Sequence, residues 1–393
     1  MKINFPLLAL ATGAFGIGVT EFAPMGLLPV IAADLDVSIP AAGLLISAYA
    51  IGVVLGAPLI TLTTGRVPRR TLLIGLAGIF TLGNLLSAIS DSYGMLLFAR
   101  IITSLNHGAF FGVGAIVAAG LVPPKRQAGA VAAMFMGLTI ANVVGVPLAT
   151  WAGEYLGWRA AFWGIAALGI VTMAALRLTL PKLPGPVGGS AVSELRVLTR
   201  GRVLAALGLT VIGSSAMFTV FTYIAPILRE QTHASLGFVT GMLVTYGLGL
   251  TVGNWLGGRY ADRSVDRTLI VTLASLSAVL VLFASLMSYA VPTAILVFLW
   301  GIASFALVPP LQLRVMTAAS AAPNLASAMN IGAFNLGNAI GAALGGGVIA
   351  AGLGYPAVAL AGAVTSALGL GAVLLARRPP AGRVSAPVCE GAT

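Results

Sequence analysis

Charged side chains are scarce in this sequence. Asp, Glu, Lys and Arg make up 8% of its 393 residues, while hydrophobic residues make up 59%. Soluble chains carry about 25% charged residues, and even large soluble domains leave much of their surface in water. Because so few polar side chains cannot cover such a surface, the composition excludes a soluble enzyme and a disordered chain. It indicates an integral membrane protein.

Residues that bind metals or form disulfides are also rare. The only cysteine, Cys389, lies in the polar C-terminal stretch, and the two histidines are His107 and His233. One cysteine excludes a disulfide within the chain and a cysteine-based metal site, and two histidines argue against a histidine-rich one. The sequence has no Gly-x4-Gly-Lys-Ser/Thr loop and no His-Glu-x-x-His motif. We therefore expect no ATP hydrolysis, no metal, no cofactor and no enzymatic activity.

The charge that is present is mostly positive, with 21 Lys and Arg against 10 Asp and Glu. The basic residues stand in short clusters between apolar runs rather than along one face, so we expect no nucleic-acid partner. If the runs cross a membrane alternately, all basic residues except Arg100, Arg159 and Arg229 fall on one side. By the positive-inside rule, this asymmetry predicts that both termini are cytoplasmic.

Twelve apolar runs are long enough to be membrane helices, for which about 20 residues are needed. They span residues 5–33, 40–63, 71–90, 94–121, 128–152, 160–180, 204–228, 236–257, 268–288, 292–313, 325–350 and 355–376. The first run is too long for a cleaved signal peptide and has Glu21 near its centre. The predicted fold class is an all-α integral membrane protein with twelve transmembrane helices.

The second half of the sequence repeats the first. A shift of 197 residues places Tyr49–Gly56 over Tyr246–Gly253, and a shift of 196 places Asn142–Gly145 over Asn338–Gly341. Each half holds six runs, so the two halves have the same orientation and form a parallel repeat. Two such bundles can rock about a site near the midplane, as the halves of secondary transporters do.

The repeat divides the chain into four predicted parts. We expect an N-terminal six-helix bundle over residues 1–180, a linker over 181–203, a C-terminal six-helix bundle over 204–377 and a tail over 378–393. The linker and the tail would be cytoplasmic. The linker is rich in proline and glycine, followed by a mixed polar stretch in which we expect a short surface helix at Ala191–Leu198.

Three stretches carry a family resemblance, namely Thr20–Pro29, Leu105–Gly112 and Met329–Asn338. With them the chain resembles the major facilitator superfamily, and within it the twelve-helix drug:proton antiporter group that includes AraJ-like and sugar-efflux proteins. The resemblance covers nearly the whole chain. It implies a bacterial inner-membrane protein that exports a small molecule in exchange for protons.

Glu21, Arg100 and His107 are predicted to form a proton-coupling cluster. A carboxylate in mid-membrane costs roughly 3 kcal/mol or more, so Glu21 must take up a proton or pair with a cation. Arg100 and His107 lie about 10 Å apart on one face of the fourth run, at a depth near that of Glu21. The alternatives are a permanently paired acid, an arginine that clamps helices together, and a hydrogen-bonded core histidine.

Aromatic and amide side chains at membrane depth, together with one methionine, are candidates for a substrate cavity. They are Met25, Asn106, Phe110, Asn142, Phe218, Tyr223, Tyr246, Trp300, Asn330, Phe334 and Asn338. Aromatic residues line most small-molecule sites, and buried amides need hydrogen-bond partners. Packing or bonding between helices is the alternative for each of them, because any apolar helix supplies such residues.

Charged loops and small residues are candidates for gates and for helix packing. The candidate cytoplasmic gate residues are Arg66, Arg69, Arg70, Asp262, Arg263 and Arg267. The resemblance implies this role, although Gly65 stands where the family's first loop has an aspartate, and simple anchoring is the alternative. The helix-packing motif comprises Gly137, Gly145, Pro147, Gly337 and Gly341. It predicts close packing or, alternatively, a sliding seam that seals the cavity.

Together these features lead us to expect a secondary active transporter that works by alternating access. It would be a monomer in the lipid bilayer and would exchange protons for small neutral or amphiphilic molecules, such as sugars or drugs. A proton-coupled uptake symporter or a facilitator on the same fold is the alternative, because a buried acid does not separate symport from antiport.

Overall fold

The computed structural model describes residues 4–64, 67–123, 127–181, 200–320 and 323–376, and these are almost entirely helical. Twelve helical segments are long and apolar enough to cross a membrane, which confirms the predicted number of spans. The helices are α1 (Phe5–Asp34), α2 (Ile39–Thr63), α3 (Arg69–Ala88), α4 (Tyr93–Ser104), α5 (His107–Gly120), α6 (Gln127–Ile140), η2 (Ala141–Gly145), α7 (Val146–Leu156), α8 (Trp158–Thr179), α10 (Gly201–Phe221), α11 (Ile224–Gln231), α12 (Leu236–Ala261), α13 (Val265–Leu286), α14 (Ala290–Ala306), α15 (Val308–Ala318), α16 (Pro323–Ala350) and α17 (Gly354–Ala376). The expected linker helix at Ala191–Leu198 and the tail lie outside the described residues.

Several spans are interrupted where the sequence predicts one continuous helix. The span Tyr93–Gly120 divides into α4 and α5 at Leu105 and Asn106, and the π-helical turn η2 separates α6 from α7. Pro147 lies just after η2 in a continuous helical backbone, and because proline has no N–H it cannot make the helical hydrogen bond that another residue would make there. Hydropathy does not detect these breaks, because apolar residues continue through them.

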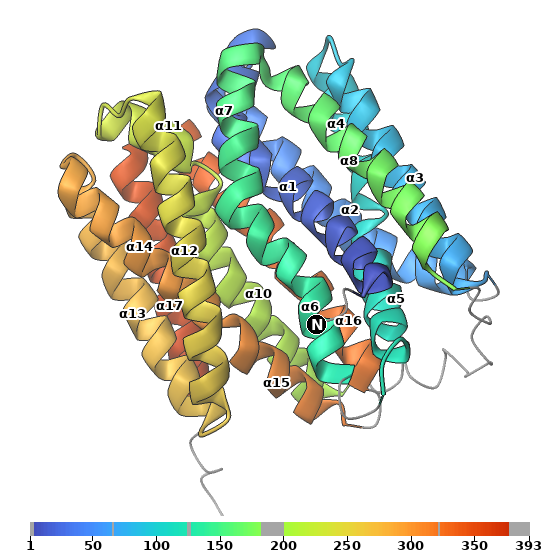
Figure 1. Ribbon diagram of the computed structural model, residues 1–393. Helices are drawn as coiled ribbons and strands as arrows, with labels where there is room; N and C mark the ends of the chain where they lie inside the picture. Colours follow the sequence, from blue (N-terminus) through green and yellow to red (C-terminus); the bar gives the residue numbers. More distant parts are fainter. Residues whose placement is uncertain (1–3, 65–66, 124–126, 182–199, 321–322, 377–393) are drawn as a thin grey trace, which may run out of the picture.

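The spans form two bundles, α1–α8 in blue to green and α10–α17 in yellow-green to red in Figure 1. In the first bundle α1 packs along α6 and α3 along α8, and in the second α10 packs along α16 and α13 along α17. Most helices of the second set begin 196 or 197 residues after their counterparts, whereas α15 begins 201 residues after α5. The repeat in sequence is therefore a repeat in space, and the predicted fold class is confirmed.

The two bundles meet along a seam, formed mainly by α2 with α16 and by α7 and η2 with α12. Ser47 Oγ donates a hydrogen bond across it to the Ala339 carbonyl oxygen over 3.1 Å. Gly247 lies so close to η2 that an added Cβ would stand 2.6 Å from the Asn142 carbonyl oxygen. We call the end of the molecule where α1 begins the terminus side and the opposite end the far side.

Glycines allow neighbouring helices to pack closely inside each bundle. An added Cβ on Gly137 or Gly145 would collide with α1, and one on Gly337 or Gly341 would collide with α10. Small residues at such positions let two helix backbones approach closely. The described contacts of these four glycines thus lie within a bundle and not on the seam.

Gly341→Ala tests this packing. The added methyl group would lie 2.6 Å from the Ser215 carbonyl oxygen and 2.8 Å from the Thr219 nitrogen, both of which are backbone atoms. We expect the variant to lose about 1–3 kcal/mol of stability through overpacking, measured as a lower melting temperature in detergent. Gly332→Ala on the same helix is the control, because its methyl group would meet nothing within 4 Å. Equal losses in the two variants would contradict the packing role.

Candidate functional site

Buried polar side chains from α1 to α5 form a network inside the first bundle. Glu21, midway along α1, is 4% exposed. The Nδ1 atom of His107 lies 3.9 Å from Glu21 Oε2 and 3.1 Å from the Tyr49 hydroxyl. The phenol and the imidazole are within hydrogen-bond distance, whereas the acid is beyond it, so proton transfer to Glu21 requires a closer approach or a bridging water. We call this set the Glu21 network, and its members are Thr20, Glu21, Tyr49, Asn84, Arg100 and His107.

Arg100 supplies the positive charge of the Glu21 network. Its Nη1 donates to the Thr20 carbonyl oxygen over 2.7 Å, and its guanidinium lies 4.3 Å from the centre of the Tyr49 ring. Thr20 Oγ1 in turn donates to Asn84 Oδ1 over 2.6 Å. Arg100 Nε and Nη2 have no hydrogen-bond partner, although the side chain is 1% exposed. The guanidinium therefore keeps unused donors for a negatively charged oxygen.

The break between α4 and α5 positions His107. Asn106 Nδ2 donates to the Thr103 carbonyl oxygen in the last turn of α4, and His107 is the first residue of α5. Gly56 lets α2 approach the break, since an added Cβ there would stand 3.0 Å from Leu105 Cα. The helix that carries Tyr49 is thus held against the point where the histidine emerges.

Three members of the Glu21 network, Thr20, Tyr49 and Asn84, were not among the sequence candidates. Tyr49 had one signal, because the repeat aligns it with Tyr246, which was a candidate. Thr20 begins one of the three stretches that carry the family resemblance, and Asn84 had no signal beyond its depth in the membrane. Among the ion pairs of described residues, none joins Arg100 to Glu21, so the arginine reaches the acid's neighbours and not its carboxylate.

Aromatic side chains form a second cluster where the bundles meet. Phe22 of α1 stacks on Phe218 of α10 with ring centres 6.0 Å apart. Tyr246 of α12 stacks on Phe221 at 4.3 Å and contacts Trp300 of α14 at 4.7 Å. These five rings are at most 4% exposed and pack on one another, so they must separate to admit a ligand. Aromatic residues line most small-molecule sites. We call this set the aromatic cluster, and its members are Phe22, Phe218, Phe221, Tyr246, Trp300 and Phe334.

Helix α1 links the two clusters. Glu21 and Phe22 are successive residues, so their side chains leave the helix about 100° apart. Glu21 faces His107 inside the first bundle, while Phe22 faces Phe218 and Phe221 of the second bundle. A rotation or shift of α1 would therefore change the surroundings of both side chains at once.

Some of the other cavity candidates have partners elsewhere in the protein. Asn330 accepts a hydrogen bond from Thr210 and donates one to Gln312 within the second bundle. Tyr223, between α10 and α11, donates to the Ala342 carbonyl oxygen. Asn330 thus joins helices of the second bundle, whereas Tyr223 also reaches the seam, where a Cβ added to Gly43 of α2 would collide with its hydroxyl.

The remaining cavity candidates differ in their surroundings. Met25 packs in the apolar core of the second bundle, and Asn142 donates to the Leu138 carbonyl oxygen. Phe110 and Asn106 border a small cavity of about 10 Å³ inside the first bundle. Asn338 is 1% exposed, and neither its Nδ2 nor its Oδ1 has a hydrogen-bond partner. Asn338 is thus the candidate amide with the most unused hydrogen-bonding capacity.

The gate candidates on the terminus side make their described contacts within single bundles. Arg70 donates to the Arg177 carbonyl oxygen, and Arg263 lies with its guanidinium 5.8 Å from the centre of the Tyr260 ring. Asp262, Arg263 and Arg267 are exposed, and Arg69 is partly buried. Arg66 lies outside the described residues.

An ion pair crosses the seam on the far side. Glu154 of α7 pairs with Arg229 of α11, and their side chains are 12% and 30% exposed. The sequence places both residues on this side but gives no signal that they pair, because hydropathy does not tell which helices adjoin. We call this pair the far-side clasp. Among the ion pairs of described residues, it is the one that joins the two bundles.

Two bundles of spans that meet around buried polar and aromatic side chains are the architecture of a membrane transporter. Known proteins similar to this chain agree. It is 57% identical to the inner membrane transport protein YdhP of Escherichia coli (strain K12), over 96% of this chain and 97% of that protein. It is 34% identical to a chloramphenicol resistance protein of Streptomyces lividans, over 86% and 87%, and 32% identical to a probable sugar efflux transporter of Pasteurella multocida (strain Pm70), over 93% and 90%.

The family is also shown directly. The model of the Major Facilitator Superfamily matches residues 10–332 and 207–392. The chain therefore belongs to the major facilitator superfamily and is a multi-pass membrane transporter, not an enzyme. Its fold is similar to the crystal structure of a bacterial homologue of the human lysosomal transporter Spinster, with a TM-score of 0.69 and 16% identity over 95% of each chain.

Glu154→Gln tests the far-side clasp. We expect the loss of the ion pair to open the far-side seam, shifting the ratio of open to closed molecules about fivefold, since a partly exposed pair contributes at most about 1 kcal/mol. Spin labels on the far-side ends of α7 and α11 measure this as a growing long-distance population. Arg159→Gln is the control, because Arg159 pairs with Asp34 at 2.6 Å on the same side but within the first bundle. Equal opening in both variants would show that the clasp is not specific.

Proposed function

We propose that this chain is a proton-coupled antiporter that exports small neutral or amphiphilic molecules, sugars or drugs. It works as a monomer in the bacterial inner membrane, with both termini in the cytoplasm, and its two bundles expose the substrate site to each side in turn. The observation that carries the proposal is the Glu21 network, a buried acid whose helix also contributes Phe22 to the aromatic cluster between the bundles.

Proton exchange at Glu21 follows from the cost of charge in apolar surroundings. A neutral carboxyl group needs no counter-charge there, whereas a carboxylate needs cationic or strong hydrogen-bond donors. Arg100 holds two unused donors for the charged state, and Tyr49 and His107 stand beside the acid as proton relays. Glu21 therefore alternates between a neutral state and a state compensated by Arg100.

Coupling arises because proton and substrate act on the same helix. Protonation of Glu21 removes its need for a cation or a strong hydrogen-bond donor beside α1 in the first bundle. Substrate in the aromatic cluster changes the contacts that Phe22 of the same helix makes with the second bundle. Exchange results if the two ligands favour different arrangements of the seam, since a ligand shifts an equilibrium only by its difference in affinity for the two states. This difference distinguishes antiport from facilitation.

The aromatic cluster and its polar neighbours suit substrates with flat or apolar faces and several hydroxyl or amide groups. Tyr246, Trp300 and the phenylalanines supply the faces. Trp300 Nε1 and both amide atoms of Asn338 are buried without partners, so a polar substrate group would satisfy them. The relatives named for chloramphenicol resistance and for sugar efflux support the same class of molecule.

Glu21→Gln tests the proton site. In liposomes loaded with a pH-sensitive dye, sugars, phenicols and cationic dyes are screened for substrate-driven proton movement by the wild type. Because glutamine cannot carry a proton, we expect the variant to lose this movement while it still exchanges labelled substrate across the membrane. Asp91→Asn, which removes an exposed acid on the far side, is the control and keeps both activities.

Three results would contradict the proposal. Substrate-driven proton movement that survives Glu21→Gln means that another group carries the proton. Wild-type substrate movement without any proton movement makes the chain a facilitator. Proton and substrate movement in the same direction makes it a symporter.

Asn338→Leu tests the substrate site. Leucine is close to asparagine in size and removes two buried polar atoms that have no partner, so we expect unchanged or slightly higher thermal stability. Transport of a hydroxylated substrate weakens, with KM rising about tenfold for the loss of roughly 1.4 kcal/mol of hydrogen bonding. Asn330→Leu is the control: it breaks bonds to Thr210 and Gln312 and lowers stability. A loss of stability in Asn338→Leu with no change in KM would assign Asn338 a structural role.

A further inference from the structure

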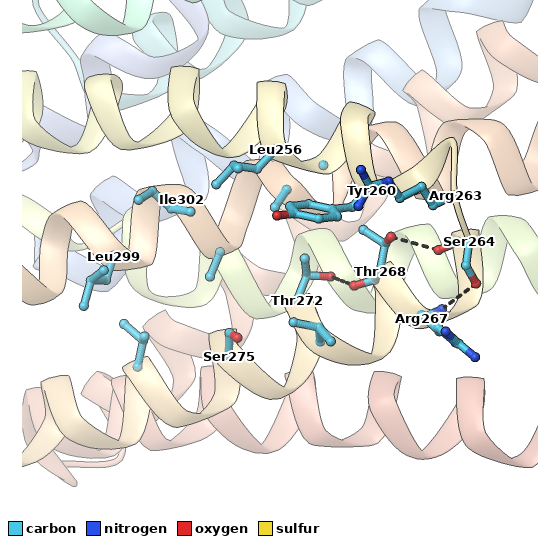
Figure 2. A pocket seen from close by; sticks show the side chains of 15 residues that line it. Leu256, Tyr260, Arg263, Ser264, Arg267, Thr268, Thr272, Ser275, Leu299 and Ile302 are labelled. Carbon is cyan, nitrogen blue, oxygen red and sulfur yellow. Dashed lines mark hydrogen bonds between the residues drawn. The ribbon is translucent and has the colours of Figure 1, made fainter.

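An apolar groove lies on the outer surface of the second bundle, between α12, α13 and α14 (Figure 2). Its volume is about 620 Å³, and Leu256, Val271, Leu299 and Ile302 are among its walls. Val271 is 62% and Leu299 is 42% exposed, so in a membrane this surface faces lipid. We call it the α12–α14 groove. It is separate from the aromatic cluster, which faces the first bundle.

The terminus-side end of the α12–α14 groove is polar. Arg263 and Arg267 line it there, with Ser264 and Tyr260 beside them (Figure 2). Both arginines are exposed. Ser264 Oγ accepts a hydrogen bond from the Arg267 backbone nitrogen over 3.4 Å, and the Ser264 carbonyl oxygen accepts one from Thr268 Oγ1 over 2.8 Å. These two hydrogen bonds fix the start of α13. Arg263 and Arg267 both lie at this end of the groove.

The charge at this mouth is positive. Among the described residues that line the groove, two are arginines and none is acidic. Two acids stand next to the arginines in sequence. Asp266 is engaged by Arg314 of α15 at 2.9 Å, and Asp262 is exposed directly after α12. The exposed Arg259 of the same turn, which stacks on Trp255, adds further positive charge nearby.

The length of the groove matches one leaflet of a bilayer. Arg267 and Val279 both line it, and they are twelve residues apart on α13, which is about 18 Å along the helix. The hydrocarbon core of a bilayer is about 30 Å thick. The groove therefore runs from the headgroup region on the terminus side to about the middle of the membrane.

We propose that the α12–α14 groove binds an anionic phospholipid from the leaflet on the terminus side. Its phosphate lies between Arg263 and Arg267, and an acyl chain lies along the apolar wall formed by Leu256, Val271 and Ile302. Arginine forms strong charge-assisted hydrogen bonds to phosphate oxygens, and basic pockets between membrane helices recognise anionic headgroups. A free phosphate would leave the apolar wall uncovered, whereas a lipid covers both parts.

The test uses the purified full chain in detergent, with phosphatidylglycerol or phosphatidylethanolamine of identical acyl chains added. Native mass spectrometry counts the lipids retained, and melting curves report their effect on stability. We expect one phosphatidylglycerol to bind more tightly than any phosphatidylethanolamine and to raise the melting temperature. In the double variant Arg263→Gln, Arg267→Gln this binding weakens about 30-fold, because each basic residue near a membrane surface contributes about fivefold.

Two further variants separate the groove from general attraction of charge. Arg200→Gln, Arg202→Gln removes the same charge from exposed positions at the start of α10 that do not line the groove and keeps wild-type binding. Val271→Trp fills the groove, leaves all charges in place and loses the bound lipid. The proposal is wrong if the two lipids bind alike, if the control pair weakens binding equally, or if Val271→Trp retains wild-type affinity. Val271→Trp tests the groove without changing any charge. The proposal therefore remains testable if the double variant misfolds.

Discussion

The burial of ionisable groups in an apolar bundle is the constraint on which the rest of this structure depends. Glu21 and Arg100 are 4% and 1% exposed, and each charge taken from water costs several kcal/mol unless partners replace the water. The Thr20 carbonyl oxygen and the Tyr49 ring supply part of that replacement for the arginine. The break before His107 supplies a partner beside the acid. The positions of α1, α2, α4 and α5 are thus set by charge as well as by apolar packing.

Backbone contacts at glycine join helices within each bundle. Gly341 lies against α10, and Gly253 lies so close to α14 that an added Cβ would collide with the Ile302 carbonyl oxygen. Helices in such contact move together, because neither backbone can pass the other without separating. The seam also has a close backbone contact, Gly247 against η2, and adds a side-chain clasp, Glu154 with Arg229, and a hydrogen bond from Ser47. The clasp and the hydrogen bond break and re-form at low cost, which favours rigid-body rocking of two bundles.

The sequence predicts the spans, the repeat and the family, because apolar length and short motifs are properties of the chain alone. It also predicts that Glu21 lies at a depth near those of Arg100 and His107, since helical rise is fixed at 1.5 Å per residue. It does not predict that Arg100 bonds the backbone of Thr20 rather than the carboxylate. That outcome depends on how α1 and α4 are rotated about their axes. Because these helices are apolar on nearly all sides, the sequence does not predict this rotation. The helix break that presents His107 is hidden for the same reason.

The two halves share a fold but differ in their buried charged residues, Glu21 and Arg100, which lie in the first half. Helix α10 begins 196 residues after α1, and α14 begins 197 residues after α4. At these offsets Glu21 corresponds to Met217, Phe22 to Phe218 and Arg100 to Val297. Apolar side chains of the second bundle therefore stand where the first bundle has its acid and its arginine. Phe22 and Phe218, which directly follow Glu21 and Met217, stack on each other across the seam. A transporter with identical halves would place charge on both faces of this contact, and desolvation would oppose its closure. Confining charge to one half lets the seam close on apolar rings while the acid beside it remains free to change its protonation.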